Sequence, residues 1–377
     1  MNKKLTITIV VIVLLGAAAA LFFSLRGGKG LAATEAPVQY VSDIIGDGSS
    51  AEHRLVAGYK ADDASKAIFI FGSRKRTQAI AEALTGCDAY DNVDGSSKPD
   101  GLKDFAGETF CTVANFSDFG EMVNDGRTDD LRELTARNVI AAMDTLCYVS
   151  PYDRSGMGKK PLAKLIILGS ACMTQYGHYD VDSLFSALGC KLPVIAPMEL
   201  ITDKAIAINK GKKILTIGVL AGNAPVDLYG PYIKTKAAKA GIDSVLCVGF
   251  KVPEGEDSLL SFLDRYSELG ISRPMDAILI DDINIDLNAF NESLEHITSV
   301  MNAESLTYGN LISPQFHVID SKSQICSATY SILRASNLFT HYISQPRQLD
   351  YMLINKDGSE KELMLLQYNE RYISTDN

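Results

Sequence analysis

The sequence predicts an α/β protein of two similar lobes, each with a parallel β-sheet flanked by helices. Short apolar runs alternate with segments of helical periodicity, which is the pattern of strands joined by crossover helices. The apolar runs are almost continuous, as expected for strands that are covered on both faces. This alternation occurs twice, so we expect a first lobe at residues 66–211 and a second at 212–347. The end of the second segment is a place where the chain can cross back to the first lobe.

Each lobe has four predicted strands. They fall at residues 67–72, 107–116, 163–169 and 192–197 in the first lobe, and at 212–222, 243–250, 276–282 and 316–320 in the second. Two intervening helices are clear: one begins at Thr128, and Asp286 is placed to cap another.

The first residues have a different character. Residues 5–25 contain 21 residues without a charge, which at about 1.5 Å per residue matches a hydrocarbon core of roughly 30 Å. We therefore expect a short tail at 1–4, a transmembrane signal-anchor at 5–25 and a linker at 26–38. The small residues at 16–20 keep open the alternative of a cleaved, secreted form.

The orientation of this span is poorly determined by charge. Lys3 and Lys4 precede it, and Arg26 and Lys29 follow it, so the positive-inside bias is nearly balanced. We expect the bulk of the protein outside the cytoplasm, in the periplasm, as is usual for a single N-terminal span.

Small antiparallel additions are predicted at both ends of the α/β body. Residues 39–65 predict two strands around the turn sequence GDGSS. Residues 348–377 predict a hairpin that turns at Asp357-Gly358, followed by a tail. These two pieces are candidates to pair with each other.

Composition excludes several classes of function. The net charge is −10 and no basic stripe is present, which argues against a nucleic-acid partner. The seven cysteines are odd in number, lack framework spacing and include no C-x-x-C, and the five histidines are scattered. We expect buried free thiols, no metal site and no cofactor.

Two strand ends carry side chains of chemical interest. In open parallel sheets, ligands bind beyond the carboxyl ends of the strands. Cys172 follows the strand AKLIILG in one lobe, and Asp281 and Asp282 end the strand DAILIDD in the other. Cys172 is either an acid/base or nucleophilic thiol or an inert thiol under the loop. The two carboxylates either face the cleft or cap a loop.

Several segments, taken in order, resemble the aspartate/glutamate racemase superfamily, glutamate racemase in particular, over about residues 65–347. IFGS looks like its opening F-D-S-G, and FSDFGEMVNDGRT resembles its F-P-Y-G…K-S loop. SACMT is similar to the A-C-N-T that carries its first catalytic cysteine. LPVIAPMEL, ILTIGVLAGNAPVDLYGPY and HVIDSKSQICSATYSIL resemble segments that follow. The resemblance implies a two-lobed fold and cofactor-independent proton transfer at an amino-acid Cα, by two thiols on opposite faces of the substrate.

On that register Cys172 stands at the first catalytic cysteine. The retained Ser73, Gly120 and Thr174 stand at substrate-binding positions. Asp282 stands at the second cysteine and is its predicted partner across the cleft.

Other positions depart from the pattern. Gly72, Phe119 and Met173 replace an Asp, a Tyr and an Asn, and Ile283 and Asn284 replace a Thr and a His. A carboxylate with an ordinary pKa near 4 is a weak base, so symmetric two-thiol racemisation is not expected.

Two functions stay open. The first is a membrane-anchored protein that binds a small amino or dicarboxylic acid between its lobes without two-thiol racemisation. The alternative is a diverged single-cysteine isomerase, racemase or decarboxylase that uses Cys172 with Asp282.

Overall fold

The structure is a computed structural model of the chain, and it describes residues 36–115, 118–150, 152, 156–222, 224–251, 257–282, 284–299, 301–340, 346–355 and 363–372. The predicted span at 5–25 lies outside these residues. Within them, no helix is both long enough and apolar enough to cross a membrane.

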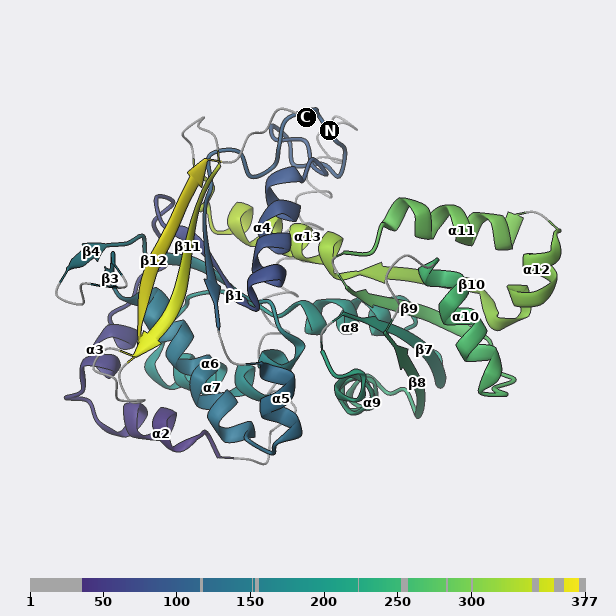
Figure 1. Ribbon diagram of the computed structural model, residues 1–377, viewed down its shortest axis with the longest axis horizontal. Coiled ribbons are helices and arrows are strands. Elements are labelled where there is room, and N and C mark those ends of the chain that lie inside the picture. The colour runs from purple at the N-terminus through teal and green to yellow at the C-terminus, as the bar shows by residue number, and fades with distance from the viewer. Residues whose placement is uncertain are drawn as a thin grey trace, which may run out of the picture.

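The described chain forms an α/β fold in which parallel sheets are flanked by helices, and two lobes lie side by side (Figure 1). The larger sheet has the strand order β4-β3-β12-β11-β2-β1-β5-β6. Its strands are β1 (Ala67–Gly72), β2 (Thr109–Ala114), β3 (Leu146–Tyr148), β4 (Met157–Lys159), β5 (Ala163–Leu168), β6 (Val194–Ile195), β11 (Arg347–Asn355) and β12 (Leu363–Tyr372). The central pairs β11·β2, β2·β1, β1·β5 and β5·β6 are all parallel.

The second lobe has a smaller sheet that is parallel throughout, in the order β10-β9-β7-β8. Its strands are β7 (Ile214–Ala221), β8 (Ser244–Phe250), β9 (Met275–Asp281) and β10 (Ile312–Asp320). All eight strands predicted for the two lobes are thus present, with shorter ends in several cases.

Helices cover both faces of the larger sheet. The helices and shorter turns of the described chain are α2 (Gln39–Gly46), α3 (Ala51–Ala57), α4 (Arg74–Gly86), α5 (Phe119–Asn124), α6 (Thr128–Met143), the π-helical turn η2 (Met173–Gly177), α7 (His178–Leu188), α8 (Pro197–Ile208), η3 (Val226–Leu228), α9 (Tyr229–Lys239), α10 (Ser258–Glu268), α11 (Leu287–Ser299), α12 (Ala303–Tyr308), η4 (Gly309–Leu311) and α13 (Ser321–Ala335). α4 and α13 pack on one face through an apolar cluster that includes Ile80 and Ile325. α2, α3, α6 and α7 pack on the other face.

The expected β extension at 39–65 is wrong, because this segment contains α2 and α3 instead of strands. Val41 and Ile44 are three residues apart and both are buried, which is the spacing of a helix face. Ser50 caps α3 by accepting a hydrogen bond from the amide of His53 at 3.1 Å. The turn sequence GDGSS therefore separates two short helices.

The C-terminal hairpin is present, but it does not form a separate sheet with the N-terminal segment. β11 and β12 are antiparallel to each other, and β11 lies parallel to β2, so the hairpin extends the larger sheet. Asp357-Gly358, at the expected turn, lies outside the described residues. The chain reaches β11 through α13, which follows β10 and packs on the first lobe. The first lobe is thus completed by the last residues of the chain.

The two lobes share one apolar core. A single cluster of buried side chains contains Phe69 and Ile166 of the larger sheet and also Leu215, Ile217 and Val219 of β7. The junction between the lobes is therefore packed with side chains over much of its area.

Candidate functional site

The candidate site lies where the carboxyl ends of β1 and β5 in one lobe meet those of β7 and β9 in the other. Gly169 follows β5 and has no room for a side chain, because a Cβ there would lie 2.8 Å from the carbonyl oxygen of Phe71. After Gly169 the chain passes into the short helical turn that carries Cys172.

Cys172 is buried, with an exposed fraction of 1%. Burial raises the pKa of its thiol to about 11; a hydrogen bond with Ser170 opposes this shift and the Asp118 carboxylate adds to it. A reactive cysteine needs a lowered pKa, so the surroundings of Cys172 favour the inert thiol.

An ion pair between the lobes lies at this junction. The guanidinium of Arg76, in the first turn of α4, pairs with the carboxylate of Asp281 at the end of β9. Its other nitrogens donate to the carbonyl oxygens of Gly169 at 2.8 Å and of Asp281 at 2.7 Å. The hydroxyl of Tyr229, at the start of α9, donates to the second carboxylate oxygen of Asp281 at 2.5 Å. Arg76 therefore joins both lobes through three hydrogen bonds.

The surroundings keep Arg76 charged and Tyr229 neutral. Burial would lower the pKa of Arg76, but the charge and hydrogen bond of Asp281, together with Tyr229 and Asp282, outweigh burial and the pKa is raised. Burial and the Asp281 charge both raise the pKa of Tyr229 well above its ordinary value. Cys172 also contributes to this shift.

Asp282, the predicted partner of Cys172, is placed differently from Asp281. It is partly exposed, and its carboxylate accepts hydrogen bonds from the backbone and side-chain nitrogens of Asn284 at 3.0 and 2.8 Å. The carboxylate carbon of Asp282 lies 3.2 Å from the position that a Cβ atom would take at Gly222. The negative charge of Asp282 contributes to the raised pKa of Arg76. The hydrogen bonds from Asn284 make Asp282 a cap of the loop after β9.

The three predicted substrate-binding residues all make local contacts. Ser73 is exposed and accepts a hydrogen bond from the backbone of Arg76, as the cap of α4. The amide of Gly120 donates to Asp118 at 2.7 Å. The hydroxyl of Thr174 donates to the carbonyl oxygen of Ser170 at 3.2 Å. Their role toward a ligand stays a prediction.

Apolar side chains occupy positions where the racemase-like pattern has polar ones. Met173 is fully buried and Phe119 is 7% exposed, and both belong to the cluster that includes Tyr229 of the second lobe. Ile283 lies outside the described residues. The junction around Cys172 is consequently apolar, with polar groups concentrated at Arg76 and Asp281.

A second group of charges joins the lobes between α8 and α9. Lys236 of α9 pairs with Glu199 and, at 3.2 Å, with Asp203, both on α8. His178 lies 3.3 Å from Glu199. His178 therefore faces this charged group.

Sequence reasoning missed Arg76, Tyr229 and Asp118. Arg76 lies three residues after Ser73, in a run of three basic residues, and nothing in the sequence distinguishes it from Arg74 and Lys75. Tyr229 and Asp118 lie on segments that were compared with the family pattern. The contacts that Arg76 and Tyr229 make with Asp281 depend on the packing of the two lobes, whereas Asp118 caps its own helix.

No protein-family model matches the chain, and no curated protein matches it. Among solved structures it is similar to glutamate racemase RacE1 from Bacillus anthracis, at 11% identity over 77% of this chain and 89% of that chain, with a TM-score of 0.44. It is also similar to glutamate racemase from Campylobacter jejuni, at 12% identity over 77% and 94% of the chains, with a TM-score of 0.40.

Proposed function

We propose that this protein binds a small amino or dicarboxylic acid between its lobes and does not racemise it through two thiols. The observation that supports binding is Arg76, which already holds a carboxylate across the junction. Guanidinium groups bind carboxylates through paired hydrogen bonds. A carboxylate ligand takes the place of Asp281 on Arg76.

The proposal against two-thiol racemisation rests on Cys172 and its surroundings. A thiol with a pKa of about 11 carries little thiolate at neutral pH, and the position opposite it in the family pattern holds a carboxylate. Met173 and Phe119 add apolar bulk beside the thiol.

The binding test uses thermal unfolding of Asp281→Asn. This substitution leaves Arg76 without its counter-charge, and removing one partner of a buried pair costs about 3 kcal/mol. D- or L-glutamate, D- or L-aspartate or succinate at millimolar concentration should raise the Tm of Asp281→Asn, because a ligand that binds only the folded state stabilises it. The wild type should gain less, because Asp281 competes with the ligand.

Two controls assign the effect to Arg76. The double variant Arg76→Met with Asp281→Asn should show no gain in Tm with any of these acids. Lys75→Met with Asp281→Asn removes an exposed cation one residue away, and it should retain the full gain. If no acid raises the Tm of Asp281→Asn, or if the gain survives the loss of Arg76, the binding proposal is wrong.

The absence of racemisation has its own measurement. Incubation of the wild type with D- or L-glutamate or aspartate in deuterated water, followed by NMR, should show no loss of the Cα–H signal. Exchange that disappears in Cys172→Ser would instead establish the single-cysteine enzyme.

We also propose that residues 5–25 anchor the protein in a membrane with its folded body outside the cytoplasm. The uncharged run of 21 residues supports this. The full chain should stay in the membrane pellet after carbonate washing, and external protease should digest its body in spheroplasts. Release of a shorter chain into the periplasm would show cleavage, and protection from the protease would reverse the orientation.

A further inference from the structure

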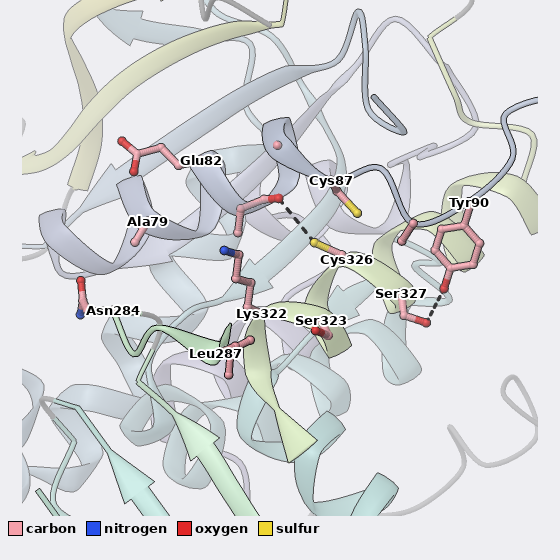
Figure 2. A pocket seen from close by; sticks show the side chains of 13 residues that line it. Ala79, Glu82, Cys87, Tyr90, Asn284, Leu287, Lys322, Ser323, Cys326 and Ser327 are labelled. Atoms are coloured by element: carbon pink, nitrogen blue, oxygen red, sulfur yellow. Dashed lines mark hydrogen bonds between the residues drawn. The ribbon is translucent and has the colours of Figure 1, made fainter. Parts of the chain in front are cut away.

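Two cysteines that are far apart in the sequence line one cavity. Cys87 and Cys326 both border a hollow of about 450 Å³ between α4, α13 and the loop at Asn284. Figure 2 shows both side chains among the residues that line this cavity. Cys87 is the residue that follows α4, and Cys326 lies in the second turn of α13.

The end of α4 brings the two thiols together. The thiol of Cys326 donates to the carbonyl oxygen of Ala83 at 3.6 Å, and Ala83 lies one helical turn before Cys87. The backbone amide of Cys87 bonds to Leu84 instead, which leaves the Ala83 carbonyl to the thiol. Cys326 is thus seated against the last turn of α4, beside Cys87.

The environment of Cys87 agrees with this placement. The neighbouring Cys326 thiol, burial and the Asp104 carboxylate all raise the pKa of Cys87. The Cys87 sulfur donates to Asp104 at 3.1 Å. Cys87 is half-buried, so small molecules can reach it from the cavity, whereas Cys326 is 6% exposed.

We propose that Cys87 and Cys326 form a dithiol pair that a low-molecular-weight disulfide, such as oxidised glutathione, converts into an intramolecular disulfide. This inference does not depend on the proposed function of the Arg76 site. The raised pKa of Cys87 leaves only a small thiolate fraction, so the first step is slow and needs alkaline pH. In this step the Cys87 thiolate attacks one glutathione sulfur, forms a mixed disulfide and releases one glutathione thiolate, which takes up a proton. The thiolate of Cys326 then attacks the Cys87 sulfur and releases the second glutathione. Two protein thiols are oxidised, and one glutathione disulfide is reduced to two thiols.

The disulfide would link α13, the helix through which the chain returns from the second lobe, to α4 of the first lobe. α13 follows β10 of the second lobe directly and packs on the larger sheet beside α4. A disulfide from its second turn to the end of α4 therefore restrains the start of α13. It also closes a long loop of chain, which restricts the unfolded state and raises stability.

The test starts from the full chain in detergent, fully reduced and then incubated with oxidised glutathione at pH 8.5. This pH is used because raised thiol pKa values slow the exchange. After denaturation and labelling with a maleimide, the oxidised protein should contain two fewer free thiols than the reduced protein with its seven. Its mass before labelling should be lower by two hydrogens, and a digest should contain the peptides of Cys87 and Cys326 joined. Its Tm should be higher than that of the reduced protein, and dithiothreitol should reverse the shift.

Matched variants identify the pair. Cys87→Ser and Cys326→Ser should form no intramolecular disulfide, while Cys190→Ser, at another half-buried cysteine, should still lose two thiols. The peptide digest of the wild type decides the question even if a variant fails to fold. An unchanged thiol count in the wild type, glutathione left on single cysteines, or a joined peptide from another pair would each overturn the proposal.

Discussion

At the scale of single residues, chemistry in this protein is decided by burial more than by residue type. Cys172 stands at the strand end where the family pattern places a catalytic thiol, yet its surroundings oppose ionisation. Asp281 and Asp282 are neighbours of identical type, but one is 3% exposed and pairs with Arg76 while the other is held by Asn284.

Cys172 offers a direct prediction. Its alkylation by iodoacetamide should keep rising with pH beyond 10, because burial places its pKa at about 11 and only the thiolate reacts. Mass spectrometry of the peptide that contains residue 172, over pH 6–11, measures this rate without interference from the other cysteines. Cys172→Ser identifies the labelled peptide. A rate that levels off near neutral pH would mean an activated thiol and would favour the enzyme.

At the scale of elements, the strands were predictable and the short helices were not. Eight apolar runs became parallel strands, and runs such as AIFIFG and AKLIILG are buried throughout, because a strand covered on both faces is composed of apolar residues. β8 and β10, at the edges of the smaller sheet, are only partly buried. α2 is 8 residues long and α3 is 7, too short for helical periodicity to stand out from strand alternation.

The candidate site was predictable only in its position. Strand ends indicated Cys172 and the pair of aspartates, since this is where parallel sheets place ligands. The partner of Arg76 lies more than two hundred residues away, and only the meeting of the two lobes selects Asp281 over Asp282. The same holds for Cys87 and Cys326, whose proximity depends on α13 returning to the first lobe.

The contact between α8 and α9 should depend on pH. Burial alone would raise the pKa of Glu199, but hydrogen bonds and charges from His178 and Lys236 outweigh it and hold the pKa far below its ordinary value of 4.5. A lowered carboxyl pKa contributes stability that is complete above the unfolded pKa and is lost as pH falls toward the folded pKa. The free energy of unfolding should therefore decline below about pH 4.5, by roughly 1 kcal/mol from this residue.

Glu199→Gln tests that contribution. The variant should be less stable than the wild type at pH 7, and the difference should shrink as pH falls below 4.5, in urea unfolding followed by circular dichroism. Asp243→Asn is a matched control, because Asp243 is an exposed carboxylate at the start of β8 that pairs with exposed Lys213 at 3.6 Å. A constant difference between Glu199→Gln and the wild type from pH 7 to pH 3 would contradict the assignment.

At the scale of the whole molecule, the two lobes are one structural unit. The apolar cluster of the first lobe continues into β7 of the second, and the ion pair of Arg76 with Asp281 crosses the junction. The path of the chain also links the lobes, because β11 and β12 belong to the first lobe but follow the last strand of the second. Any cut between the lobes therefore removes α13 and two strands from the first lobe.

Unfolding should accordingly be a single cooperative transition. In differential scanning calorimetry, residues 36–377 should give one peak whose calorimetric and van't Hoff enthalpies agree, which is the signature of a two-state process. Asp281→Asn should lower the temperature of that peak without splitting it, because the shared apolar core remains when the ion pair is lost. Two peaks in the wild type would mean that the lobes unfold independently. Splitting that appears only in Asp281→Asn would mean that the ion pair, and not the apolar core, couples the lobes, and a carboxylate that displaces Asp281 would then separate them at little cost.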